Sequence, residues 1–76
     1  MIKEHDCVIL ASDLPGAGLA AGDLGTVVHV HHRDAGYEVE FMTLTGRTIA
    51  VVTLQAGQVR PISEREVAHA RELTRS

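Results

Sequence analysis

The amino-acid sequence predicts a mainly β fold: a small, five-stranded antiparallel barrel followed by a C-terminal helix. Three observations support this class. Short runs of β-branched residues recur between turn sequences, the turns are tight, and a helix-capping pattern occurs only near the C-terminus. A chain of 76 residues has room for one small domain. We expect the barrel over residues 1–62, with residues 63–76 forming a helix and tail that are not a separate domain.

The first strand is expected over residues 6–11, where an apolar run follows Asp6. Cys7 is the only cysteine, so no internal disulfide can form, and its apolar neighbours predict a small hydrophobic core residue. A glycine-rich loop then runs from the turn at residues 12–16 to about Gly25. Three leucines are spaced through this loop as the expected anchors: Leu14, Leu19 and Leu24.

The second and third strands are expected over residues 26–32 and 37–43, joined by a four-residue turn at 33–36. Strand alternation then sets the register, because a slip of one residue would place apolar side chains on the wrong face. The predicted inward pairs are Val28 with Phe41, Val30 with Val39 and His32 with Tyr37. The predicted outward pairs are Val27 with Met42, His29 with Glu40 and His31 with Glu38.

The fourth strand is expected over residues 48–54, after a turn at 44–47, and it is apolar on both faces. A further turn at 55–58 leads into a short last strand at 59–62, where Pro61 suits a sheet edge.

The C-terminal region has the signature of a helix start. Ser63 and Glu66 have the spacing of a capping box, and Ile62 with Val67 has the spacing of a hydrophobic staple. We therefore expect a helix from about Glu64 to Leu73, with a thin apolar stripe that covers outward-facing strand residues or meets a second subunit there. The expected interaction surface consists of Val27, Met42, Ile49, Val51, Val67, Ala70 and Leu73.

Composition narrows the classes of function. The formal net charge is −3, and the seven Lys and Arg residues are scattered, so the sequence lacks the clustered cations that a phosphate backbone requires. One Tyr, one Phe and no Trp argue against an aromatic ligand groove. The N-terminal apolar run is too short for a signal peptide or membrane span. A cytoplasmic location, with no membrane partner, is the expectation.

Three stretches carry a family resemblance: Gly18–Val28, Tyr37–Phe41 and Gly46–Thr48. Over roughly residues 5–62 the chain resembles a family of small bacterial SH3-like barrel proteins known only as a domain of unknown function. Some members of that family are carried as integron gene cassettes. The resemblance implies an SH3-like barrel, and it implies neither catalytic residues nor a cofactor. The run Gly-Asp-x-Gly-Thr-Val-Val also occurs in wider SH3-like barrels, where it marks a turn into a strand.

The predicted register gathers two imidazoles and two carboxylates on one outer face: His29, His31, Glu38 and Glu40. Cross-strand side chains lie about 5 Å apart, so this face has donors of the kind that bind zinc. The alternative is a solvated strand face of paired opposite charges. The alternative is favoured, because a His-x-His pattern without a second tight motif is common by chance.

The sequence favours a non-enzymatic protein that binds a protein partner or its own copies, as a homo-oligomer, through the outer apolar surface. Such a protein could be an accessory adaptive product of a mobile gene. One alternative is a nucleic-acid-binding or ribosome-associated module, which needs a basic surface formed by Arg33, Arg47 and Arg60. A second alternative is a metal-dependent activity at the face of His29, His31, Glu38 and Glu40.

Overall fold

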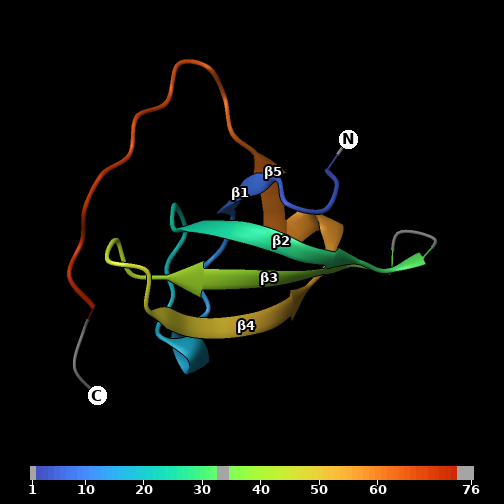
Figure 1. The fold of residues 1–76 in the computed structure, drawn as a ribbon, viewed down its shortest axis with the longest axis horizontal. Coiled ribbons are helices and arrows are strands. Elements are labelled where there is room, and N and C mark those ends of the chain that lie inside the picture. The colour runs from blue at the N-terminus through green and yellow to red at the C-terminus, as the bar shows by residue number, and fades with distance from the viewer. Residues whose placement is uncertain (1, 33–34, 74–76) are drawn as a thin grey trace.

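The computed structural model describes residues 2–32 and 35–73, and these form a five-stranded antiparallel sheet in the order β4-β3-β2-β1-β5 (Figure 1). The predicted mainly β class with antiparallel strands is confirmed. Two 3₁₀ turns, η1 (Pro15–Ala17) and η3 (Ala56–Gln58), lie in the β1–β2 and β4–β5 connections. The strands are β1 (Cys7–Leu10), β2 (Leu24–Val30), β3 (Tyr37–Met42), β4 (Thr48–Leu54) and β5 (Val59–Pro61).

The core is one cluster of buried side chains, and every strand contributes to it. Leu19, from the β1–β2 loop, closes it with 4% of its surface exposed. That loop is anchored by a short antiparallel bridge between Leu14 and Leu19. The strand residues of the core are Val8, Leu10, Val27, Val39, Phe41, Leu54 and Val59.

The register between β2 and β3 differs from the predicted one, because Val28 forms a β-bulge. Val27 pairs with Val39 and Gly25 pairs with Phe41, and the register shifts just after Val27. A Cβ on Gly25 would lie 2.9 Å from the Phe41 ring and 2.5 Å from Val39 Cγ1, so only glycine lets the ring pack here. The extra residue bulges outward. The predicted pairs of Val28 with Phe41 and Val30 with Val39 are therefore wrong.

The same shift changes the turn between these strands. Val30, rather than His32, pairs with Tyr37, and the His31 amide donates to the Gly36 carbonyl at 2.9 Å. The predicted turn at 33–36 includes residues 33 and 34, which lie outside the described residues.

Strand β4 has the predicted bounds and forms one edge of the sheet, with β3 as its neighbour. Ala50 and Val52 pair with the core residues Phe41 and Val39 of β3 and pack against the core, and Leu54 is itself a core residue. Val51, opposite Glu40, is 54% exposed.

The predicted C-terminal helix is wrong. Within the described residues, the chain after Pro61 makes one turn at residues 64–65 and then continues without helical structure to Leu73. Figure 1 shows this segment as a long arc beyond β5. The capping residues close a local turn, but a short helix needs tertiary packing along its apolar stripe, and Val67 in that stripe is 91% exposed. We call residues 62–73 the C-terminal segment.

Candidate interaction site

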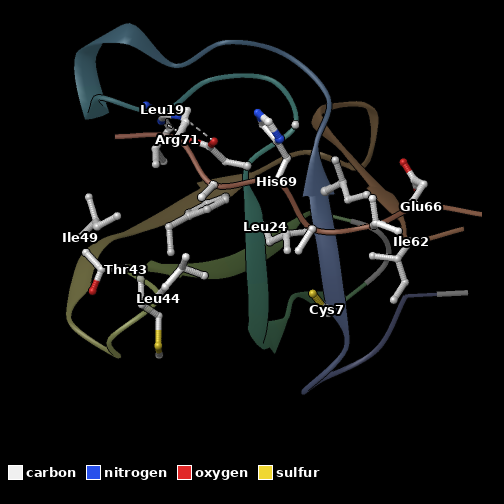
Figure 2. A pocket seen from close by; sticks show the side chains of 18 of the residues that line it. Cys7, Leu19, Leu24, Thr43, Leu44, Ile49, Ile62, Glu66, His69 and Arg71 are labelled. Carbon is white, nitrogen blue, oxygen red and sulfur yellow. Dashed lines mark hydrogen bonds and ion pairs between the residues drawn. The ribbon is translucent and has the colours of Figure 1, made fainter. Parts of the chain in front are cut away.

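A cavity of about 810 Å³ lies between the sheet and the C-terminal segment. Its floor forms where β2 begins, β3 ends and β4 begins, which is one end of the antiparallel sheet, together with β1 and the β3–β4 turn. Figure 2 shows the floor side chains below the segment that crosses them. We call this cavity the groove, and its apolar floor consists of Cys7, Leu24, Met42, Leu44 and Ile49.

The floor of the groove is unusually open for apolar side chains. Leu24 and Met42 are each 44% exposed, and Leu44, in the β3–β4 turn, is 87% exposed. The register shift between Phe41 and Met42 interrupts the inward–outward alternation at the end of β3, which leaves Met42 outside the core. A gathering of apolar side chains of this kind is typical of a binding surface.

The C-terminal segment is attached at two places. At its start, both Glu66 carboxylate oxygens accept hydrogen bonds from Arg60, at 3.0 and 2.6 Å. Glu66 Oε1 also accepts from the Ser63 amide at 2.7 Å, so the predicted capping partners meet although no helix follows. These hydrogen bonds, Arg60 foremost, lower the pKa of Glu66 to about 2.

At its other end, the segment is held by Arg71. The guanidinium donates from Nε to Asp23 Oδ1 at 2.8 Å, from Nη2 to Asp23 Oδ2 at 2.5 Å, and from Nη2 to the Gly18 carbonyl at 3.2 Å. The hydrogen bond from Arg71 is the main reason that the pKa of Asp23 lies below its ordinary value of 3.8, with partial burial opposing it. The exposed fraction of the Asp23 side chain is 17%.

The turn before β2 holds Asp23 in position for this contact. Asp23 Oδ2 accepts from the Ala20 amide at 2.9 Å, while the Asp23 amide donates to the Ala20 carbonyl at 3.0 Å. Gly22, at φ 97°, supplies the left-handed residue that this turn requires. Asp13 braces the turn from outside by accepting from the Ala21 amide at 2.8 Å.

The structure brings most of the predicted interaction surface together around the groove. Val51 lies outside the groove, on the exposed side of β4. Val27 was expected on the outer face, and this is wrong: it is fully buried, because the bulge at Val28 moves the register. The residues of the predicted interaction surface that line the groove are Met42, Ile49, Val67, Ala70 and Leu73.

Sequence reasoning missed part of the site. Cys7 was expected in the core, but it is exposed and lines the groove, because it begins β1 where the sheet no longer covers it. Leu24 was expected as a loop anchor and is instead a half-exposed floor residue. The contact between Asp23 and Arg71 had no local signal, since the two residues are 48 positions apart.

The predicted cluster of histidines and carboxylates is split in two by the register shift. His31 Nε2 lies 2.7 Å from Glu38 Oε2, and Thr53 donates to the same oxygen at 2.7 Å. The predicted strand pairing of His31 with Glu38 is nevertheless wrong, because the backbone register places Glu38 opposite His29. These two contacts, Thr53 first, lower the pKa of Glu38. Glu40, however, accepts from Thr48 at 2.5 Å and pairs with Thr26 rather than with His29.

His29 takes a different partner, Glu4, whose Oε2 lies 3.5 Å from His29 Nδ1. The His29 and His31 rings meet edge to face, with centroids 5.0 Å apart. Over residues 2–32 and 35–73, no three His, Cys, Asp or Glu side chains are grouped so that they could hold a metal ion. The arrangement in the described chain is a line of histidine–carboxylate pairs across the strand face.

The arginines of the predicted basic surface do not share one environment. Arg60 is paired with Glu66, and Arg47 is exposed in the β3–β4 turn. Arg33 lies outside the described residues. None of the helical turns in the described part of the chain has the length and apolar character needed to cross a bilayer.

Residues 4–61 match the model of the family described as Domain of unknown function (DUF4926). The match ends at the last residue of β5, so the C-terminal segment lies beyond it. No curated protein and no solved structure matches the chain.

Proposed function

The chain belongs to the DUF4926 family, and we propose that it is a non-enzymatic self-assembly module whose groove binds the groove of a second copy. The observation that carries this proposal is the open apolar floor of Leu24, Met42 and Leu44. Burying apolar surface against a partner gains about 25 cal/mol per Å² removed from water.

The chemistry of the floor favours a second copy as the partner. In a two-fold dimer the same patch contacts itself, so any charged side chain on the floor would meet its own charge. The five floor residues include no Asp, Glu, Lys, Arg or His. They are therefore self-complementary, although the whole chain has a formal charge of −3.

The small size of the domain also favours association between copies. A domain of this size buries only about 60% of the surface that its unfolded chain exposes, so its core supplies a small margin of stability. Association adds buried apolar surface without lengthening the chain.

We also infer an SH3-like barrel as the finer fold class. The strand order, the long β1–β2 loop and the 3₁₀ turn η3 before β5 support it.

Light scattering across a range of protein concentrations tests the proposed association. We expect the parent chain to approach twice the mass of one chain as its concentration rises, and Met42→Lys to remain a monomer. The matched control is Val28→Lys, because Val28 is 41% exposed, close to the 44% of Met42, but lies outside the groove.

A third variant, Val51→Lys, separates the groove from the edge of the sheet, because Val51 lies on the outer side of β4. A dimer that tolerates Met42→Lys and is lost in Val51→Lys would place the contact on β4 and contradict the proposal. A parent chain that stays monomeric at all concentrations would also contradict it.

A further inference from the structure

The way in which the C-terminal segment crosses the groove carries an inference that rests on the proposed function and makes it more specific. We propose that two copies exchange their C-terminal segments, so that Arg71 of each copy binds Asp23 of the other. The occupant of each groove is then residues 67–73 of the second copy.

Within one chain, the segment crosses the groove without filling it. It is tied down near Glu66 and at Arg71, while Val67 between them is 91% exposed. The floor below is also half-exposed, and the cavity of about 810 Å³ separates the floor from the segment. Apolar side chains therefore face each other across a gap, which forfeits the contacts that close packing would supply.

The turn at the start of the segment explains why it forms an arc. Arg60, Ser63 and Glu66 form a closed set of hydrogen bonds just after β5, and the Glu66 amide also donates to the Ser63 carbonyl at 3.1 Å. This turn fixes the direction in which the segment leaves its own sheet. Because Arg60, Ser63 and Glu66 are neighbours in one chain, the turn persists in either arrangement, and the exchange concerns the residues after Glu66.

Charge complementarity identifies what the far end of the groove accepts. Asp23 binds the Arg71 guanidinium through two hydrogen bonds, and Asp13 adds a favourable charge nearby, which helps to raise the pKa of Arg71. The Gly18 carbonyl accepts a third hydrogen bond from the same side chain. This end of the groove therefore accepts a guanidinium group, which Arg71 supplies.

Exchange keeps every one of these contacts and adds new ones. The hydrogen bonds of Arg71 to Asp23 and Gly18 are the same whether they form within a chain or between chains, which is why exchange of an identical element has a low cost. The gain comes from the floor, because two exchanged copies bring their grooves together. Leu24, Met42 and Leu44 then lose exposed surface that a single chain cannot cover.

The reach of the segment limits how the copies are arranged. From Glu66, which the turn holds beside its own β5, to Arg71, an extended chain spans at most about 18 Å. The longest dimension of one molecule is 36 Å. The segment can therefore reach a neighbour's Asp23 only if the two grooves face each other, and not if they lie on opposite sides of the pair.

A charge-reversal complementation experiment tests the exchange. Asp23→Arg and Arg71→Asp each place like charges at the contact, both within a chain and between identical chains. In a 1:1 mixture, Arg71 of the Asp23→Arg variant can bind Asp23 of the Arg71→Asp variant. The substituted arginine at position 23 of the first variant can likewise bind the substituted aspartate at position 71 of the second. Both contacts therefore return only if they form between chains. The double variant Asp23→Arg/Arg71→Asp is the control, because it restores the contact in every arrangement.

Light scattering supplies the readout. We expect dimers of the parent chain and of the double variant, at least about tenfold weaker dimerisation of each single variant, and recovery of the dimer mass in the mixture. Single variants that dimerise like the parent chain, or a mixture no more dimeric than its components, would overturn the exchange. If the mixture fails while Met42→Lys still abolishes the dimer, the proposed function stands without the exchange. A monomeric parent chain removes both.

Asp23 also holds the Ala20 turn, so Asp23→Arg can unfold the β1–β2 loop. A measurement on the parent chain tests the exchange without this substitution. In an equimolar mixture of ¹³C-labelled and unlabelled protein, isotope-filtered NMR should show intermolecular contacts between the Arg71 side chain and residues 18–23. Contacts that are exclusively intramolecular would overturn the exchange.

Discussion

The Arg71 guanidinium and the Asp23 carboxylate form two parallel hydrogen bonds, at 2.8 and 2.5 Å, and so join the C-terminal segment to the turn before β2. Bidentate pairs of this kind are among the stronger polar contacts in proteins, because the planar donors match the carboxylate in geometry as well as in charge. This contact holds the far end of the segment over the groove.

Acidification should release the Arg71 end of the C-terminal segment. The pKa of Asp23 is lowered in the folded protein, so the stabilisation from this contact is fully present above the ordinary value of 3.8 and is lost as the pH falls through the folded value. A ¹³C NMR titration of the Asp23 carboxyl should give a pKa below 3.8 in the parent chain. Arg71→Gln should move that pKa upward.

Arg65→Gln is the control for this titration, since Arg65 lies in the same segment and Asp23 pairs with Arg71 instead. An Asp23 pKa that stays the same after Arg71→Gln would show that the ion pair is not formed in solution.

Glu66→Gln should open the turn at the start of the C-terminal segment. The Glu66 carboxylate joins Arg60 to the Ser63 amide, and the glutamine side chain replaces one charged acceptor with an amide donor. Trypsin should therefore cut after Arg65 several-fold faster in Glu66→Gln than in the parent chain. Glu64→Gln, which changes a neighbouring exposed carboxylate, should leave the cleavage rate unchanged.

The turn should also be sensitive to pH in a defined direction. Because the pKa of Glu66 is about 2, against an ordinary value of 4.5, the stabilisation that Glu66 supplies is complete above pH 4.5 and disappears between pH 4.5 and pH 2.

In the trypsin experiment, equal cleavage rates for Glu66→Gln and the parent chain would contradict the turn geometry.

Gly25→Ala should destabilise the fold by about 1–3 kcal/mol, as inserting atoms into a filled core does. The new Cβ would lie 2.5 Å from Val39 Cγ1 and 2.9 Å from the Phe41 ring. Gly16→Ala is the matched control, since a Cβ there meets nothing within 4 Å. Urea unfolding followed by circular dichroism measures both variants, and equal midpoints for the two would refute the close packing of Gly25 against Phe41.

Local patterns were sufficient to predict the strands. β4 has the predicted bounds, and the other strands lie within about two residues of theirs, because alternation and turn residues act over a few positions. The inward position of Phe41 was also predicted, although the wrong partner was assigned to it. The partner depended on the bulge at Val28, which exists because the Phe41 ring needs the space above Gly25.

The groove and the C-terminal segment also combine features that local sequence predicts with features that only long-range contacts decide. The sequence by itself determined that apolar side chains such as Met42 and Ile49 lie outside the core, and that Ser63 and Glu66 interact. The tertiary structure alone decided that the segment after Glu66 is not helical and that it ends on Asp23. The physical reason is range: a cap is satisfied within one turn of chain, whereas helix growth depends on packing against distant surfaces, and Arg71 finds its carboxylate 48 residues away.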